Sequence, residues 1–157
     1  MPAFQSDGVE IAYLDEGTGD PILLVHGFAS NIATNWGDPG WIRHLVRDGR
    51  RVVAIDNRGH GASARLHDPA AYGAPIMAED CRRLLDHLSI ATADVMGYSL
   101  GGGVAWQIAI RHPDVVRRLV TISAAVKRSG LYPEVIAAMA GVNAEAAETM
   151  KPSPIWS

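Results

Sequence analysis

The chain has 157 residues, of which 48% are hydrophobic and 20% are charged, and its formal net charge is −3. The length corresponds to about one domain, and the composition is typical of a folded globular protein, which excludes a disordered or collagen-like chain. The small negative net charge argues against a basic surface that could bind a phosphate backbone, so we expect no nucleic-acid partner.

The first ten residues, MPAFQSDGVE, lack the basic head and the apolar core of a secretion signal. No run of 18 apolar residues occurs anywhere in the sequence, so we expect no membrane span and no membrane partner. These features predict a cytoplasmic protein.

Two apolar segments near the N-terminus predict strands. Residues 9–16 (VEIAYLDE) alternate between apolar and polar, as a strand with one solvated face does. Residues 21–26 (PILLVH) are almost continuously apolar, which is typical of a strand buried on both faces of a parallel sheet. Because only a short turn separates the two segments, we expect an antiparallel hairpin at one edge of the sheet.

Strands and helices alternate along the rest of the chain. The pattern predicts strands over 51–56, 93–97 and 115–123, and helices over 41–48, 75–88 and 99–111. Such alternation indicates an α/β fold with a mostly parallel sheet and helices on both faces. Cys81 is the single cysteine, so no internal disulfide forms, and at its place in the helix 75–88 we expect it to pack as a small hydrophobic residue.

The amino-acid composition of the sequence changes near its C-terminal end. Residues 1–128 are interpreted as the N-terminal part of the α/β core, and the alanine-rich residues 129–157 as the start of a helical cap, with Asn143 as a helix N-cap. A sheet that ends at Ser123 has an exposed apolar edge, which favours pairing with another segment or chain. We therefore expect a sheet that is incomplete at its C-terminal edge.

The segment Gly97-Tyr98-Ser99-Leu100-Gly101 fits the pattern G-x-S-x-G where a predicted strand meets a predicted helix. A serine at this point sits on a very tight turn, and glycines two residues before and after it remove collisions with the neighbouring backbone. The turn exposes the Ser99 hydroxyl and directs the first N–H groups of the helix to the same place. Taken alone, the pattern also fits a glycine-rich helix start without chemistry.

Two further motifs follow predicted parallel strands at their carboxyl ends, where open α/β sheets bind ligands. His26-Gly27-Phe28 follows the strand 21–26, and the segment 56–63 (DNRGHGAS) follows the strand 51–56. In this order and spacing, over residues 9 to 128, the three motifs resemble the α/β-hydrolase family: the HG turn, the D-x-R-G-x-G-x-S loop and the serine turn.

The resemblance implies roles for individual residues. Ser99 matches the catalytic nucleophile, and the backbone N–H groups of Phe28 and Leu100 match the two donors of the oxyanion hole. Gly97, Gly101 and Gly27 match the glycines of the serine turn and the HG turn. A serine at position 99 argues against the relatives that use an aspartate nucleophile, such as haloalkane dehalogenases and epoxide hydrolases.

Other polar residues in the motifs are expected to support the structure. The resemblance makes the loop of Asp56 and Arg58 structural, although Asp56 remains a candidate catalytic acid, and we expect Arg58 to pair locally. His26 and His60 are expected to brace turns and not to transfer protons. The aromatic side chains Trp36 and Trp41 either line the entrance of a pocket or are buried.

A serine nucleophile needs a base and an orienting carboxylate, which follow the serine in this family in the order acid, then histidine. The only histidine after Ser99 is His112, 13 residues further along the same predicted helix. At about 1.5 Å per residue it is about 20 Å away, which excludes it as the base, and Asp114 is excluded for the same reason. We expect the acid and the histidine to come from a missing C-terminal part or from another protein chain at the open sheet edge.

These features predict a serine hydrolase that forms an acyl-enzyme at Ser99 with a small carboxylic ester, thioester or lactone. Neither a cofactor nor a metal is implied, and this chain alone is expected to be inactive. One alternative is a non-catalytic ligand-binding module of the same fold. Another is a cofactor-free perhydrolase or a carbon–carbon bond hydrolase, which uses much the same serine turn.

Overall fold

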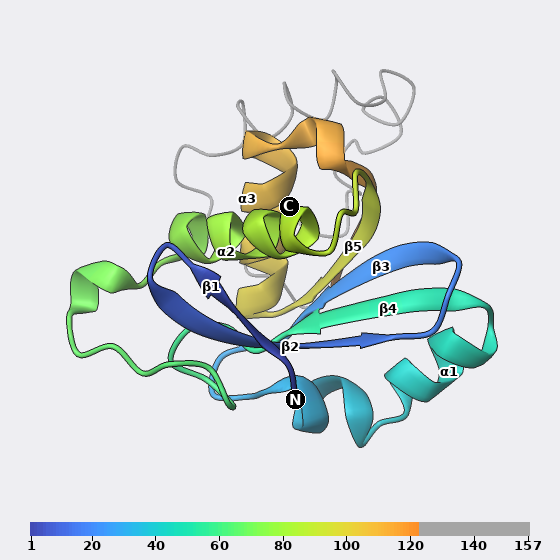
Figure 1. Cartoon of the computed structure of the whole chain (residues 1–157), viewed down its shortest axis with the longest axis horizontal. Coiled ribbons are helices and arrows are strands. Elements are labelled where there is room, and N and C mark those ends of the chain that lie inside the picture. Colours follow the sequence, from blue (N-terminus) through green and yellow to red (C-terminus); the bar gives the residue numbers. More distant parts are fainter. Residues whose placement is uncertain (123–157) are drawn as a thin grey trace, which may run out of the picture. The chain divides into compact units, whose positions relative to one another are not determined.

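The computed structural model describes residues 1–122, so the predicted cap over 129–157 and the predicted N-cap Asn143 lie outside the described residues. These residues form a six-stranded sheet with the strand order β1-β2-β4-β3-β5-β6 (Figure 1). The strands are β1 (Ala3–Ser6), β2 (Val9–Glu16), β3 (Asp20–Val25), β4 (Arg50–Ile55), β5 (Ala93–Tyr98) and β6 (Val116–Ile122). The helices are α1 (Trp41–Arg47), α2 (Ala74–His87) and α3 (Leu100–Arg111). Three short helical turns, η1 (Ala33–Gly37), η2 (Pro69–Ala71) and η3 (Pro113–Val115), complete the described elements.

The strand β3 lies inside the sheet because its residues are apolar on both faces. Leu23, Leu24 and Val25 are fully buried, and β3 pairs in parallel with β4 on one side and with β5 on the other. Figure 1 shows α2 and α3 on one face of the sheet and α1 on the other. The predicted α/β fold with a mostly parallel sheet and helices on both faces is therefore confirmed.

The predicted hairpin between the first two apolar segments is wrong. Strand β2 pairs antiparallel with β4 and not with β3, because β4 lies between them. The crossover from β3 through α1 returns the chain beside β3, and a parallel crossover of this kind fills the position that the hairpin would have used. The antiparallel hairpin of this edge is formed by β1 and β2, around Asp7 and Gly8. Both turn residues have a positive φ, 50° and 78°, as a two-residue hairpin loop requires.

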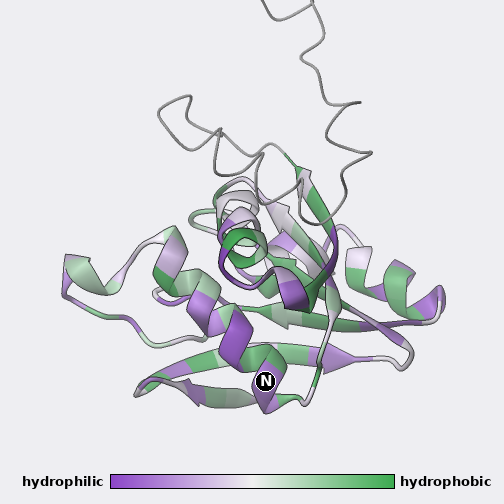
Figure 2. Cartoon of the chain, turned by 90° about the horizontal axis from the view of Figure 1, so that it is seen from above, coloured by the Kyte–Doolittle hydropathy of each residue, from purple (hydrophilic) through white to green (hydrophobic). Residues whose placement is uncertain are grey.

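Each face of the sheet has its own apolar core. The larger core lies under α2 and α3 and includes Cys81, which is fully buried. Burial raises the pKa of the Cys81 thiol well above its ordinary value. The smaller core lies under α1 and contains Trp36 and Ile42. Figure 2 shows the hydrophobic residues along the central strands, whereas the helices also carry hydrophilic residues.

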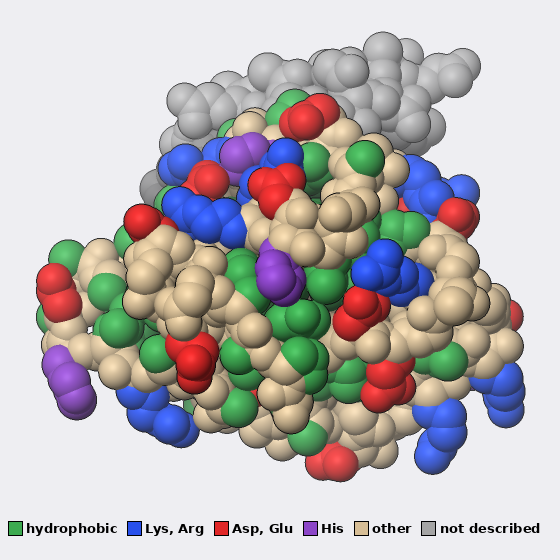
Figure 3. Space-filling view, in the orientation of Figure 1, with side chains coloured by type: hydrophobic (Ala, Val, Ile, Leu, Met, Phe, Trp, Pro, Cys, Tyr) green, Lys and Arg blue, Asp and Glu red, His purple; other side chains and the backbone are tan. Residues whose placement is uncertain are grey.

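Several charged side chains on the surface form ion pairs. In Figure 3 basic and acidic groups lie beside one another on the visible face and do not form a patch of one sign. Arg51 on β4, for example, donates two hydrogen bonds to the carboxylate of Asp15 on β2, at 2.9 and 2.8 Å. None of the helices within residues 1–122 is long and apolar enough to cross a membrane.

Asp94 is a buried carboxylate where β5 begins, at the opposite end of the strand from Ser99. It accepts hydrogen bonds from Arg50 at 2.6 Å and from Arg117 at 2.8 Å, so it links β4, β5 and β6. Burial raises the pKa of Asp94, but the hydrogen bonds and charges of Arg117 and Arg50 outweigh burial and hold this pKa below its ordinary value. The ionised form is therefore favoured in the folded protein.

Replacing Asp94 with Asn is expected to lower the free energy of unfolding at pH 7 by about 1–3 kcal/mol, because two guanidinium groups lose their shared carboxylate while remaining partly exposed to water. The stabilisation from a carboxylate with a lowered folded-state pKa is present above its unfolded pKa, about 3.9, and is lost as the pH falls through the folded value. The difference between wild type and Asp94→Asn should therefore shrink below about pH 4, which urea denaturation at several pH values measures. The control is Asp20→Asn, because Asp20 also faces Arg117 but its side chain is 71% exposed. If the difference in the free energy of unfolding between wild type and Asp94→Asn stayed constant down to pH 3, Asp94 could not be an ionised partner of Arg50 and Arg117 in the folded protein.

Candidate active site

Ser99 occupies a sharp turn between β5 and α3. Its backbone has φ 52° and ψ −114°, a region that side-chain-bearing residues rarely adopt. The Ser99 N–H donates to the carbonyl of Ile122 on β6 at 2.8 Å, and the Ser99 carbonyl accepts from Gly102 at 2.9 Å. The turn is thus held by both the sheet and the helix, which sustains the unfavourable backbone conformation.

The glycines at positions 97 and 101 are required by close backbone contacts. A Cβ atom on Gly97 would lie 2.1 Å from the carbonyl oxygen of Gly101. A Cβ atom on Gly101 would lie 2.1 Å from the carbonyl oxygen of Val25 and 2.6 Å from that of His26. Because no side chain fits at either position, α3 approaches the carboxyl end of β3 more closely than a helix with side chains there permits.

The HG turn lies against the serine turn. A Cβ atom on Gly27 would lie 3.4 Å from the Cβ atom of Ser99 and 3.0 Å from the ring of Tyr98. The Gly27 N–H donates to Asn35 Oδ1 at 3.0 Å, which fixes this turn to η1. The structure therefore brings together the two motifs that the sequence placed 70 residues apart. The contribution of Asn35 was not predicted, because no local pattern links it to Gly27.

The N-terminus of α3 provides free backbone donors at this corner. The first N–H groups of a helix have no partner within the helix. The amides of Gly102 and Gly103 donate to the Ser99 carbonyl, which leaves the Leu100 N–H outside these bonds. Phe28, which follows the HG turn and is 77% exposed, and Leu100 together line a cleft beside this corner.

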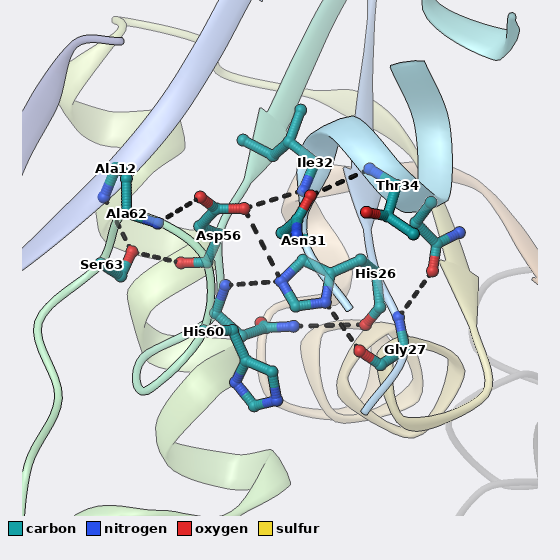
Figure 4. A network of polar contacts seen from close by, with 12 residues as sticks. Ala12, His26, Gly27, Asn31, Ile32, Thr34, Asp56, His60, Ala62 and Ser63 are labelled. Atoms are coloured by element: carbon teal, nitrogen blue, oxygen red, sulfur yellow. Dashed lines mark hydrogen bonds and ion pairs between the residues drawn. The ribbon is translucent and has the colours of Figure 1, made fainter. Parts of the chain in front are cut away.

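His26 and Asn57 connect the ends of β3 and β4 behind this corner; Figure 4 shows His26 within this network. His26 is fully buried, its Nδ1 lies 2.7 Å from the Gly27 carbonyl, and its Nε2 lies 3.0 Å from the Asn57 N–H. These partners require a donor at Nδ1 and an acceptor at Nε2, which is the neutral form of the ring. Burial lowers the pKa of His26, and this outweighs the opposite effect of the bond to Gly27. His26 therefore holds the HG turn and has no nitrogen free for proton transfer.

The carboxylate of Asp56 also serves the backbone (Figure 4). It accepts hydrogen bonds from the N–H groups of Ile32 and Ala62, both at 2.8 Å, and the residue is almost fully buried. A Cβ atom on Gly61, whose φ is 51°, would lie 2.0 Å from this carboxylate. The loop after β4 is thus wrapped closely around Asp56, and the carboxylate joins it to the loop after β3.

Replacing Asp56 with Asn is expected to destabilise the protein by about 2 kcal/mol, because an amide oxygen and an NH₂ group cannot replace a carboxylate that accepts two buried N–H groups. Reaction of Ser99 with a fluorophosphonate probe should stay within about threefold of wild type once the protein is folded. Thermal denaturation and the labelling rate measure the two effects, with Asp38→Asn at an exposed position as the control. A stable variant whose Ser99 no longer reacts would instead make Asp56 the catalytic acid.

Arg58 is buried and does not pair within its own loop, so the expectation of local pairing was wrong. Its guanidinium group donates to both oxygens of Asp80 on α2, each at 2.7 Å, and to the Ala71 carbonyl at 2.8 Å. Asp80 also accepts from Ser6 on β1 at 2.5 Å. The carboxylate raises the pKa of Arg58, so this group remains charged. Because Asp80 lies on a separate helix, the spacing of residues in the motif could not predict this contact.

The cleft at the site has a volume of about 530 Å³ and lies between the loop after β3, the loop after β4 and the start of α2. His60, Tyr72 and Met77 contribute to its wall beside Phe28 and Leu100. Neither tryptophan lines this cleft; Trp41 is 41% exposed and lines a separate pocket with Pro39 and Arg43, so only Trp36 follows the expectation of burial. Trp36 is buried and packs edge to face against Trp41, with the ring centroids 6.4 Å apart.

His112 lies at the far end of α3 from Ser99. Its Nε2 is 3.0 Å from a carboxylate oxygen of Glu79 on α2, so its partner is outside the cleft. The twelve residues of α3 lie between it and Ser99, so the two residues are 13 positions apart, which corresponds to about 20 Å at about 1.5 Å per residue. Within residues 1–122, moreover, no group of three or more His, Cys, Asp or Glu side chains is placed to hold a metal ion.

Comparison with known proteins gives consistent results. The sequence model of the family described as "alpha/beta hydrolase fold" matches residues 20–154. A 2-hydroxymuconate semialdehyde hydrolase from Pseudomonas sp. (strain CF600) is 37% identical over 118 residues, which cover 75% of this chain and 41% of that protein. An esterase from Exiguobacterium antarcticum superposes with a TM-score of 0.71 at 28% identity, over 79% of this chain and 45% of that chain. Epoxide hydrolase A from Mycobacterium thermoresistibile superposes with a TM-score of 0.70 at 27% identity, over 76% of this chain and 37% of that chain. The chain thus spans less than half the length of these relatives.

Proposed function

Because this chain belongs to the alpha/beta hydrolase fold family, we propose that it carries the nucleophile and the oxyanion-binding corner of a serine hydrolase. The observation that supports this most directly is the backbone of Ser99, with its φ of 52°, between two glycines on which a Cβ atom would lie 2.1 Å from a backbone oxygen. Strain of this kind persists where the surrounding structure fixes it, and it is concentrated at functional sites. A glycine-rich helix start without chemistry needs neither the strained serine nor the close approach of the HG turn.

In the proposed reaction the Ser99 oxygen attacks the carbonyl carbon of a bound substrate, and the carbonyl oxygen becomes an oxyanion. The N–H groups of Phe28 and Leu100 stabilise that charge, because they come from the two turns that meet beside Ser99. The bond from the carbonyl carbon to the leaving group then breaks, and the leaving group takes the proton that the serine lost. Water hydrolyses the acyl-enzyme and restores Ser99.

The proton transfer needs a histidine that the described site does not provide. His26 is fully used by its two hydrogen bonds and His112 pairs with Glu79. We propose that the histidine and its acid come from a further part of the protein or from another chain, which pairs at the β6 side of the sheet. Within residues 1–122, β6 has a strand partner only in β5.

The proposed substrate is a small carboxylic ester, thioester or lactone. The largely apolar wall of the cleft suits a short acyl group, and the two backbone donors suit a carbonyl oxygen that gains charge. No cofactor takes part in these steps.

Carbon–carbon bond hydrolysis is the second candidate. The observation in its favour is the similarity to relatives named 2-hydroxymuconate semialdehyde hydrolase, at 37% and 42% identity. Comparing p-nitrophenyl acetate with 2-hydroxymuconate semialdehyde as substrates of the complete protein separates the two candidates, since a carbon–carbon hydrolase should turn over the second far faster.

Reaction with a fluorophosphonate probe tests the proposed function. The complete protein should be labelled, and peptide mass spectrometry should locate the phosphonyl group on Ser99, because only an activated serine attacks the probe at a useful rate. A complete, folded protein that is not labelled would support the non-catalytic ligand-binding module instead.

A further inference from the structure

Among the described residues that line the cleft beside Ser99, only His60 and Tyr72 carry polar side-chain atoms. Met77 and the ring of Tyr72 contribute apolar surface to its wall. The Tyr72 hydroxyl is already bonded to Leu66, because it donates its hydrogen to the Leu66 carbonyl and accepts from the Leu66 N–H, both at 2.8 Å. Among the described lining residues, His60 therefore has the one side chain with an uncommitted polar atom.

The ring of His60 is held in place from several sides. Its Nδ1 lies 3.0 Å from the Arg58 carbonyl, an acceptor, so Nδ1 carries the hydrogen. The Arg58 side chain is itself fixed by its bidentate bond to Asp80. The ring packs edge to face on Phe28, with centroids 5.8 Å apart, and lies 5.2 Å from the ring of His26. Figure 4 shows the His60 ring directed away from the hydrogen bonds around His26 and Asp56.

Among the residues that the structure describes, the other ring nitrogen of His60, Nε2, is left for a ligand. It has no hydrogen-bond partner within residues 1–122, and it is not among the buried unpartnered atoms of that part of the chain, which are Trp36 Nε1 and Asn57 Oδ1. In the tautomer that has its hydrogen on Nδ1, Nε2 is an acceptor. His26 does not compete for the same ligand, because its own Nε2 accepts from Asn57.

We infer that His60 is a specificity-determining residue, which selects substrates whose acyl group carries a hydroxyl by accepting a hydrogen bond from that hydroxyl at Nε2. This inference rests on the proposed function and names the substrate class of the same site. A fixed acceptor in an apolar cleft favours a ligand with a matching donor, because a purely apolar ligand leaves the acceptor unpaired and removes it from water. The preferred substrates are thus esters of short hydroxy acids.

The test compares p-nitrophenyl 3-hydroxybutyrate with p-nitrophenyl butyrate as substrates of the complete protein. The ratio of their kcat/KM values should favour the hydroxylated ester about tenfold, since one hydrogen bond in an open cleft distinguishes the two. His60→Phe keeps an aromatic ring against Phe28 but removes the acceptor, and the ratio should fall to about one. His60→Gln offers an amide oxygen and should restore part of the preference. His67→Phe, at an exposed position outside the cleft, should leave the ratio unchanged.

A second measurement does not depend on turnover. Nitrogen-15 NMR of the histidine rings should find His60 with its hydrogen on Nδ1, and 3-hydroxybutyrate should shift the Nε2 resonance whereas butyrate should not. If Ser99 is not labelled by a fluorophosphonate, the proposed function fails but this binding measurement still decides the role of His60. A ratio that His60→Phe leaves unchanged in a labelled protein, or a His60 resonance that both acids leave unmoved, would overturn the inference.

Discussion

Ser99→Ala is expected to lower the turnover of p-nitrophenyl acetate by the complete protein by roughly 10⁴-fold or more, because no other group of the site can form the acyl-enzyme. The same substitution should leave the free energy of unfolding nearly unchanged, since alanine keeps the Cβ atom and hence the strained backbone. Ser99→Gly should be equally inactive and yet more stable than Ser99→Ala. The backbone at position 99 has a φ of 52° and a ψ of −114°, which are unfavourable for any residue with a side chain but are accessible to glycine.

The gain in stability follows from two opposing effects. Relief of backbone strain contributes about 1–3 kcal/mol, and the greater freedom of glycine in the unfolded chain removes about 0.5–1 kcal/mol. Ser99→Gly should therefore be about 0.5–2 kcal/mol more stable than Ser99→Ala in urea denaturation. Ser89 is a matched control, because it is an exposed serine with a φ of 55° outside the cleft. Ser89→Gly should also gain stability, but with unchanged turnover. Equal stabilities for the glycine and alanine variants at position 99 would argue against the strained turn.

The parts of the fold that sequence patterns predicted are those set by neighbouring residues. Helix α1 was predicted to within one residue, over 41–48 against Trp41–Arg47, and β2 over its full extent. The serine turn was predicted for the same reason, because the glycines at 97 and 101 lie two residues on either side of Ser99. The position of the HG turn beside it followed from the rule that the carboxyl ends of parallel strands meet at one edge.

Contacts between distant segments were missed or misassigned. The order of β2, β4 and β3 depends on a crossover, and a short turn in the sequence gave the opposite expectation. The partner of Arg58 is Asp80, 22 residues away on α2, where an acidic residue at a helix position looks like any solvated charge. The hydrogen bonds between Tyr72 and Leu66 leave His60 as the polar group of the cleft. They were also not predicted, because the loop that carries them has no periodic residue pattern.

Gly101→Ala is expected to destabilise the protein by about 3–5 kcal/mol, a large share of the stability of an ordinary domain. The added methyl group would lie 2.1 Å from the Val25 carbonyl oxygen and 2.6 Å from that of His26. Both oxygens belong to the backbone at the end of β3, which is paired on both sides and cannot move without breaking its bonds to β4 and β5. The helix must therefore move away from the sheet, and Ser99 moves with it.

The matched control for this variant lies two residues further along the same helix. A Cβ atom on Gly103 would meet nothing within 4 Å, so Gly103→Ala adds the same methyl group to α3 without a collision. It should raise the free energy of unfolding by up to about 1 kcal/mol, because alanine favours the helix over glycine. Urea denaturation compares the two variants, and fluorophosphonate labelling at a temperature where both are folded reports the position of Ser99. Labelling should be lost in Gly101→Ala and retained in Gly103→Ala. If the two variants were instead within 1 kcal/mol of each other, the close approach of α3 to β3 could not be what holds the serine against the HG turn.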